Sequence, residues 1–329
     1  MTEWVLLTGA SGRIGRRAVD ALLRKGYGVR ALVHRRRSGF PDDPRVILAP
    51  GDLADRDSLR AAAEGCSYVA HLAAAWDMFP PAVNEKDNDQ LFASVIRGTY
   101  DLLEACRGLP GLKAFVYAST DAVYATGPRR FEAPIDEDTE LQPSRFYAVA
   151  KIACETLCRQ YGKLYGLPWI VVRICWTLDS DELLRVFGYD FWQGGLGDAD
   201  RARLGPALGE GRGLFAPLCA DGSPGVDCIA DPLDIAQGIA QAIENHARGL
   251  GGTFNLAGPA PFRYADLVAR PAERLALPWA SARVKGIEPY ELRNDRAIDA
   301  LGYAPEWTME RMLDKAVEAR LAKAGGRKA

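Results

Sequence analysis

The stretch Leu6–Arg17, LLTGASGRIGRR, decides the fold of this chain. Its three glycines, Gly9, Gly12 and Gly15, stand three residues apart directly after a short apolar run. Glycine tolerates the positive φ of a tight turn and lets the backbone approach a diphosphate closely, and a helix that follows points its N–H groups at the anion. The pattern predicts a phosphate-binding turn between a strand and a helix, to which the Ser11 hydroxyl adds a donor. A glycine turn without a ligand is the alternative.

Short apolar runs alternate with helical patterns through the first half of the chain. Near-continuous apolar strands joined by helices are typical of a parallel sheet that is covered on both faces. We therefore expect an α/β fold with a doubly wound parallel sheet of the Rossmann type. The expected strands are residues 4–9, 28–34, 45–52, 68–74, 114–120 and 169–175, and the expected helices include Arg13–Lys25, Arg56–Ala63, Asp89–Arg107 and Phe146–Tyr165.

The pattern changes from about Leu178, where Gly, charged and aromatic residues follow without a clear period. We interpret this part as a smaller substrate-binding lobe over the carboxyl edge of the sheet, where ligands bind in such folds. The predicted dinucleotide-binding domain comprises residues 1–178 and 226–257, and the predicted lobe comprises residues 179–225 and 258–329.

Composition narrows the possible function classes. The chain has 329 residues, of which 48% are hydrophobic and 26% charged, with a formal net charge of −2. A near-neutral balance argues against nucleic acid as the main partner. The sequence shows no signal-peptide pattern and no apolar run that is long enough for a membrane span. The seven cysteines suit reduced thiols in the cytoplasm, and we expect no metal site, since Cys154 and Cys158 lack further ligands nearby.

The end of the second expected strand bears on the choice of cofactor. An enzyme selective for NAD usually has an acidic residue here for the ribose 2′-hydroxyl. This chain instead has His34, Arg35 and Arg36, and no acidic residue lies between Asp20 and Asp42. Guanidinium groups suit a 2′-phosphate, so NADP(H) is favoured and NAD(H) remains possible. A solvated basic loop is the alternative.

Tyr147 and Lys151 stand four residues apart in an expected helix, so they share one helix face. Nearby positive charge would lower the pKa of the phenol and let it exchange a proton with an alcohol or carbonyl during hydride transfer. Ser119 and Thr120 end an expected strand at the ligand edge, where a hydroxyl can hold the reacting oxygen. The alternatives are that Tyr147 and Lys151 are ordinary residues of an amphipathic helix and that Ser119 or Thr120 caps the following turn.

In this order, these motifs resemble those of the extended short-chain dehydrogenase/reductase family, which includes NAD-dependent epimerases and dehydratases. The resemblance covers nearly the whole chain. It rests on the segments TGASGRIG, GDLAD, HLAAA, STDAVY and YAVAK, with weaker C-terminal landmarks at DPLDIAQGI, FNLAG and LGYAP.

The resemblance implies a catalytic set of Thr120, Tyr147 and Lys151. It also implies a homodimer joined through the helices around Asp101 and Ala153. The residues expected to contact the cofactor are Gly9, Ser11, Gly12, Arg13, Ile14, Gly15, His34, Arg35, Arg36, Asp52, Leu53, Ala73, Ala74, Ser119, Tyr147, Lys151 and Ile174.

Three positions depart from the family's pattern. Val95 replaces an asparagine that usually helps to organise the active site. RICWTLDS replaces the usual Arg-Pro and Tyr-Gly turn, which puts Trp176 near the expected substrate. Reductase relatives often have arginine where His34 stands, so the phosphate contact falls to Arg35 or Arg36.

The function we expect is NADP(H)-dependent transfer of hydride to or from a carbonyl or secondary alcohol of a medium-sized substrate. Trp76, Tyr124 and Trp176 are the candidate substrate contacts. A nucleotide-sugar epimerase or dehydratase with retained cofactor is one alternative, although no Glu follows Asp121 as a dehydratase usually requires. A cofactor-sensing regulator without turnover is another.

Overall fold

The computed structural model describes residues 2–34, 39–74 and 87–325. Its central element is a seven-stranded sheet with the strand order β11-β6-β5-β4-β1-β2-β3, in which every neighbouring pair is parallel. This confirms the predicted doubly wound sheet. The strands are β1 (Trp4–Thr8), β2 (Gly28–Val33), β3 (Val46–Pro50), β4 (Tyr68–His71), β5 (Ala114–Thr120), β6 (Trp169–Ile174) and β11 (Thr253–Leu256).

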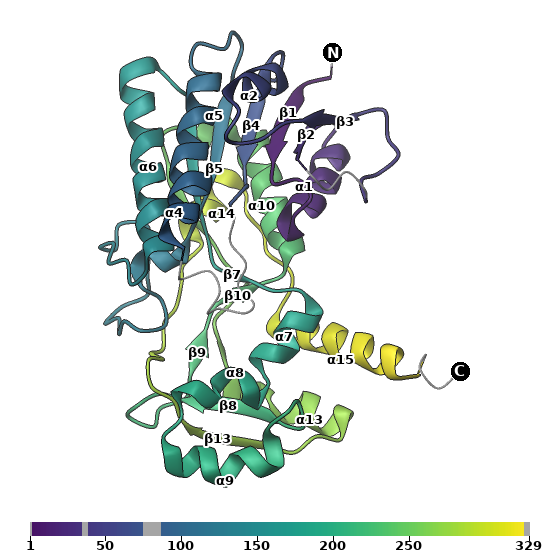
Figure 1. Ribbon diagram of the computed structural model, residues 1–329, viewed down its shortest axis with the longest axis vertical. Coiled ribbons are helices and arrows are strands. Elements are labelled where there is room, and N and C mark those ends of the chain that lie inside the picture. The colour runs from purple at the N-terminus through teal and green to yellow at the C-terminus, as the bar shows by residue number, and fades with distance from the viewer. Residues whose placement is uncertain (1, 35–38, 75–86, 326–329) are drawn as a thin grey trace.

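Helices cover both faces of this sheet (Figure 1). One face packs against α1 (Arg13–Arg24), α10 (Pro232–Glu244), α11 (His246–Gly249) and α14 (Asp295–Leu301). The other face packs against α2 (Arg56–Ala63), α4 (Asn88–Leu91), the π-helix η1 (Phe92–Arg97), α5 (Gly98–Cys106) and α6 (Phe146–Tyr165). The inner strands are apolar because both of their sides are buried, and every residue of β5 is buried. The edge strand β3 is partly exposed.

Local signals set several element ends. Asp55 caps α2 by accepting hydrogen bonds from the backbone N–H groups of Asp57 and Ser58. Asp231 caps α10, whose first residue is Pro232. Gly166 ends α6 in the left-handed conformation, with φ of 71°. The predicted bounds of α2 and α6 are therefore confirmed.

Apart from α10, α11, β11 and α14, the segments after β6 build a smaller unit beyond the carboxyl edge of the sheet (Figure 1). Its strand pairs are β7 with β10, β8 with β13 and β9 with β12. The strands are β7 (Trp176–Thr177), β8 (Leu214–Leu218), β9 (Val226–Asp227), β10 (Ile229–Ala230), β12 (Phe262–Arg263) and β13 (Trp279–Arg283). The helices of this unit are α7 (Ser180–Val186), α8 (Tyr189–Trp192), η3 (Gln193–Gly195), α9 (Asp198–Leu208), α12 (Tyr264–Leu267), α13 (Ala269–Leu275) and α15 (Met309–Gly325). A separate 3₁₀-helix, η2 (Asp121–Tyr124), directly follows β5 of the central sheet.

Two local expectations differ from the structure. The expected single helix Asp89–Arg107 contains the π-helical turn Phe92–Arg97 in its middle. Ala297 and Leu301 of α14 join the hydrophobic core on one face of the central sheet, although the sequence division assigned them to the lobe. This segment lies against the sheet because its apolar face covers β11. The rest of the predicted division stays a prediction.

A buried ion pair joins α6 to β6 beneath the carboxyl edge. The Glu155 side chain is 0% exposed and the Arg173 side chain is 3% exposed. Arg173 donates to both carboxylate oxygens of Glu155 at 3.0 and 2.8 Å, and Ser119 and Arg159 donate to the same carboxylate at 2.6 Å each. Because all these groups are paired, the network fixes the ends of β5 and β6 relative to α6.

We expect Glu155→Ala to lower the free energy of unfolding by about 3–5 kcal/mol, because it leaves the Arg173 guanidinium buried without its carboxylate. Urea denaturation monitored by circular dichroism measures this loss. The control is Asp200→Ala, which breaks an exposed pair with Arg203 and is expected to cost about 1 kcal/mol or less. Equal losses in the two variants would contradict a structural role for the buried pair.

Candidate active site

The glycine turn packs so closely that side chains are excluded. Gly9 adopts φ of 69°, and the N–H of Gly12 donates to the carbonyl of Gly9 at 3.0 Å. A Cβ on Gly15 would lie 2.1 Å from the carbonyl oxygen of Gly9, and one on Gly9 would lie 2.8 Å from the nitrogen of Ala73. The turn therefore leaves a side-chain-free cradle at the N-terminus of α1, which fits a diphosphate group.

A cavity of about 680 Å³ opens between this turn and the smaller unit. The ends of β5 and β6 form one wall, and Phe191 and Trp192 of α8 form part of the opposite wall. The cavity brings together the following predicted site residues: Gly9, Gly12, Arg13, Ile14, Gly15, Ala74, Ser119, Thr120, Tyr147, Lys151, Ile174 and Trp176.

Tyr147, Lys151 and Thr120 meet in this cavity from two elements. Lys151 lies with its Nζ 5.7 Å from the centroid of the Tyr147 ring and 5.0 Å from that of the Tyr117 ring. Its ammonium donates to the carbonyl of Ala118 at 2.7 Å, so the side chain is fixed beneath the cavity. The Thr120 hydroxyl oxygen accepts a hydrogen bond from the N–H of Ala122 at 3.2 Å. A phenol, an ammonium group and a hydroxyl thus line one space.

Burial controls the protonation of this set. Desolvation raises the pKa of the Tyr147 phenol, and the nearby Asp121 carboxylate raises it further, while Arg145 opposes both. Desolvation lowers the pKa of Lys151 to about 8. The sequence predicted the opposite shift for the phenol. That prediction concerned the phenol beside the ammonium group and the positive nicotinamide of a bound cofactor, and it stays a prediction. In the protein alone, the loss of water around Tyr147 outweighs the opposing effect of Arg145.

Two aspartates lie in the same cavity next to this set. Asp121 and Asp227 are each 7% exposed, and both line the cavity. Burial raises the pKa of Asp121 to about 7, with a further contribution from the charge of Asp227 and opposition from the hydroxyls of Thr126 and Thr120. Burial also raises the pKa of Asp227. The sequence analysis noted Asp121 only as part of a dehydratase pattern and missed Asp227, which no local motif marks.

Tyr124 does not lie where the sequence predicted. Its side chain is 0% exposed and does not line the cavity. Its hydroxyl donates to Asn255 Oδ1 at 2.9 Å and accepts a hydrogen bond from Arg173 at 2.7 Å. The expected substrate contact is therefore corrected to an interior role, because the turn of η2 directs this ring into the core.

Ser119 also uses its hydroxyl away from the cavity, since it donates to the buried Glu155 at 2.6 Å. Val95, at the position of the usual asparagine, is buried in the π-helical turn, and its carbonyl accepts a hydrogen bond from the Cys154 thiol at 3.4 Å. The backbone carbonyl of Val95 thus has a hydrogen-bond partner inside the protein.

The residues expected at the adenine end are partly described. His34 Nε2 lies 3.3 Å from Asp52 Oδ2, and both side chains are largely exposed. Leu53 packs beside Gly98, and the N–H of Ala73 donates to the Thr8 hydroxyl at 3.2 Å. Arg35, Arg36 and Trp76 lie outside the described residues.

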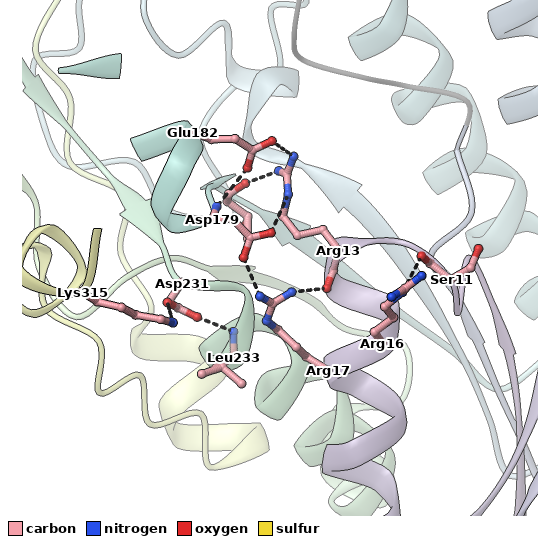
Figure 2. Close-up of polar contacts among 10 residues, drawn as sticks. Ser11, Arg13, Arg16, Arg17, Asp179, Glu182, Asp231, Leu233 and Lys315 are labelled. Carbon is pink, nitrogen blue, oxygen red and sulfur yellow. Dashed lines mark hydrogen bonds and ion pairs between the residues drawn. The ribbon is translucent and has the colours of Figure 1, made fainter. Parts of the chain in front are cut away.

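Arg13 is engaged by the smaller unit (Figure 2). Its guanidinium donates to Glu182 and, at 2.5 Å, to the carbonyl of Thr177. Arg17, one helical turn later, donates to Asp179 at 2.5 Å, and Ser11 uses its backbone carbonyl to accept from Arg16. The side chain of Arg13 therefore ties the glycine turn to the start of α7, while its backbone remains at the cradle.

Within residues 2–34, 39–74 and 87–325, no group of three or more His, Cys, Asp or Glu side chains could hold a metal ion. None of the helices in these ranges combines the length and apolar character that a membrane crossing requires.

Comparison with known proteins gives a family match. The sequence model of the NAD dependent epimerase/dehydratase family matches residues 5–177. L-arabinose 1-dehydrogenase (NAD(P)(+)) of Haloferax volcanii is 32% identical over 195 residues, which are 54% of this chain and 69% of that protein. UDP-glucuronate 4-epimerase 4 of Arabidopsis thaliana is 31% identical over 176 residues, which are 50% of this chain and only 39% of that protein.

Solved structures extend the likeness to the whole chain. A short-chain dehydrogenase/reductase superfamily protein from Agrobacterium tumefaciens with bound NAD has a TM-score of 0.82 at 30% identity and covers 99% of both chains. UDP-glucuronic acid 4-epimerase from Bacillus cereus, in complex with UDP-glucuronic acid and NAD, has a TM-score of 0.73 at 22% identity, over 96% of this chain and 98% of that one. At that identity the second likeness shows the fold alone.

The raised pKa of Asp121 predicts a pH-dependent stability. An aspartate in the unfolded chain titrates near pH 4, whereas folded Asp121 titrates at about 7, so its contribution to stability is present below about pH 4 and is lost as the pH rises through about 7. We expect the free energy of unfolding of Asp121→Asn to rise relative to that of the natural protein by about 4 kcal/mol as the pH increases from 4 to 8.

Chemical denaturation across this pH range measures the difference. Asp299→Asn, at an exposed position of α14, serves as the control and is expected to show no such trend. A constant difference between Asp121→Asn and the natural protein at all pH values would contradict the burial argument.

Proposed function

Because the chain belongs to the NAD dependent epimerase/dehydratase family, we propose that it is an NAD(P)-dependent dehydrogenase or reductase. It would transfer hydride between the cofactor and a secondary alcohol or carbonyl of a medium-sized substrate. The observation that carries this proposal is the single cavity in which Thr120, Tyr147 and Lys151 face the glycine cradle of residues 9–15.

The residues present fit a dinucleotide. The cradle at Gly9, Gly12 and Gly15 would hold the diphosphate, because no side chain blocks its approach to the N-terminus of α1. Lys151, which is fixed at the base of the cavity, would hold the nicotinamide ribose. When bound, the nicotinamide supplies or accepts the hydride.

The protein's own groups would handle the proton. Burial keeps the Tyr147 phenol protonated, so in the reducing direction it can donate a proton to a substrate carbonyl oxygen. In the oxidising direction the phenolate would take the proton of an alcohol, and the positive charges of Lys151 and of the oxidised nicotinamide, when bound, would favour that form. Thr120 would orient that oxygen from the end of β5. Lys151, whose pKa is about 8, places an exchangeable proton close to the phenol ring. Phe191 and Trp192 of the smaller unit would exclude water from this side of the cavity.

One observation favours net oxidation or reduction over epimerisation, and a second favours it over dehydration. The arabinose dehydrogenase match covers 69% of that protein, whereas the UDP-glucuronate epimerase match covers 39%. Ala122 stands where a dehydratase would usually have Glu after Asp121. A nucleotide-sugar epimerase with retained cofactor is the second candidate, supported by the family match and by several epimerase relatives.

We propose that NADP(H) is preferred, on the basis of the basic run that includes Arg35 and Arg36. We further propose a cytoplasmic homodimer. The cytoplasm is supported by the seven cysteines, which are all unpaired and buried. The dimer is supported by exposed apolar side chains of α6, such as Val149 and Leu164, together with Phe92 of the neighbouring π-helix.

Tyr147→Phe removes the proton-transferring hydroxyl while keeping the ring. We expect turnover to fall by roughly 100- to 10,000-fold and cofactor affinity to change by about two-fold or less. Net formation or loss of NAD(P)H by absorbance, with a panel of sugars and hydroxy compounds, measures turnover. Tyr165→Phe, at the exposed end of the same helix, is the matched control. Unchanged turnover in Tyr147→Phe would remove this residue from the mechanism.

The cofactor preference rests on a charge contact and has its own test. The double variant Arg35→Ala with Arg36→Ala is expected to weaken NADPH binding by roughly 10- to 100-fold and NADH binding by less than about three-fold, because only NADPH carries the 2′-phosphate. Titration of cofactor fluorescence gives both dissociation constants. Equal losses for the two cofactors would refute the preference.

A further inference from the structure

The substrate end of the cavity has a strongly acidic wall. Beyond Thr120, this wall consists of Asp121, Thr126, Asp227, Glu288 and Tyr290. Asp121 comes directly after β5, whereas Asp227 ends β9 and Glu288 follows β13, so three separate segments bring carboxyl groups to one place. Two of these carboxyl groups, on Asp121 and Asp227, are nearly buried.

The two buried aspartates have different hydrogen-bond partners. Asp227 accepts hydrogen bonds from the Tyr290 hydroxyl at 2.5 Å, the Cys228 N–H at 2.7 Å and the Tyr264 hydroxyl at 3.1 Å. A carboxylate has about four acceptor positions, so Asp227 is close to saturated by the protein. Its role is to anchor the smaller unit and to contribute negative charge.

Asp121 keeps acceptor capacity for a ligand. It accepts only two side-chain hydrogen bonds, both long, from Thr120 and Thr126 at 3.2 Å each. Within the part of the chain that the structure describes, no lysine or arginine forms an ion pair with Asp121. Its effect on the pKa of Tyr147 places its charge within electrostatic reach of the proton-transferring phenol. A substrate held against Thr120 and Tyr147 therefore meets this carboxylate.

Among the described residues, three positive side chains line the cavity: Arg13, Lys151 and Arg145. Arg13 is paired with Glu182, and the Lys151 ammonium donates to the carbonyl of Ala118. Arg145 stands at the exposed start of α6 and acts on the Tyr147 phenol. An anionic substrate group beside the buried Asp121 and Asp227 would meet two carboxyl groups that form no ion pair with the described lysines and arginines, which is costly in a region of low dielectric.

We propose that Asp121 selects an uncharged polyhydroxy substrate, of the free-sugar type, by accepting a hydrogen bond from a hydroxyl next to the reacting carbon. In the same place its charge and that of Asp227 exclude the corresponding sugar acids. This inference rests on the proposed function and adds the substrate class to it.

Matched sugar pairs test this selection. D-galactose and D-galacturonate, and likewise D-glucose and D-glucuronate, differ only in a hydroxymethyl group against a carboxylate. The natural protein is assayed with NAD(P)+ at about pH 8, above the pKa of about 7 of Asp121. We expect the neutral member of a pair to have the higher kcat/KM, by roughly 10-fold or more.

Two single substitutions distinguish the contribution of Asp121 to the selectivity from that of Glu288. Asp121→Asn is expected to raise KM for the neutral sugar by roughly 10- to 100-fold, with a smaller effect on kcat. The ratio of kcat/KM for the neutral sugar to kcat/KM for the sugar acid is expected to fall at least about 10-fold. Glu288→Gln removes a carboxylate from the same wall, one that already faces Arg130, and is expected to change the preference by less than about three-fold. Cofactor dissociation constants serve as the check that both variants keep the folded cradle.

The possible outcomes distinguish failure of this inference from failure of the proposed function. A preference for the neutral sugars that collapses in Asp121→Asn supports the proposal. A preference for the sugar acids, or an Asp121→Asn variant with unchanged selectivity, overturns it and leaves the proposed dehydrogenase function standing. If no sugar of either kind gives net NAD(P)H while another hydroxy compound does, the substrate class is overturned and the dehydrogenase function stands. If no compound of the panel gives net NAD(P)H, the proposed function fails and this inference fails with it.

Discussion

The close packing of the glycine turn against helix α1 is the constraint on which the rest of the molecule depends. The carbonyl of Gly9 occupies the space that a side chain on Gly15 would need, with only 2.1 Å to the position of its Cβ. This contact sets α1 directly after β1, at the centre of the parallel sheet. Because the ends of β4, β5 and β6 lie at the same edge, the cradle, Thr120 and Lys151 come to one cavity.

Burial gives this cavity its chemical character. Loss of water favours the neutral forms of Tyr147, Lys151 and Asp121. It brings Lys151 and Asp121 near the balance between two protonation states around neutral pH, whereas it holds the Tyr147 phenol in its protonated form. The same burial costs stability, since charge on Asp121 is unfavourable in the folded protein. Sites of this kind commonly trade stability for reactivity, and here the fully paired Glu155–Arg173 network lies directly beneath them.

The smaller unit also contacts the glycine turn through ion pairs with α1. Figure 2 shows Arg13 and Arg17 of α1 reaching Asp179 and Glu182 at the start of α7. These ion pairs join the cradle to the unit that carries Phe191, Trp192 and Asp227. The start of α7 is therefore held against the first turn of α1.

The sequence by itself determined six of the seven strands of the parallel sheet, the bounds of α2 and α6, and the turn at residues 9–15. Side-chain periodicity, capping residues and the φ range of glycine act over a few neighbouring residues. The sequence also placed Tyr147 above Lys151, since spacing by four on a helix needs no distant partner. Only the tertiary structure decided that Tyr124 points into the core, that Arg13 is engaged by Glu182, and that Asp227 stands beside Asp121. Those outcomes depend on how segments far apart in the chain pack and exclude water, and no local pattern carries that information.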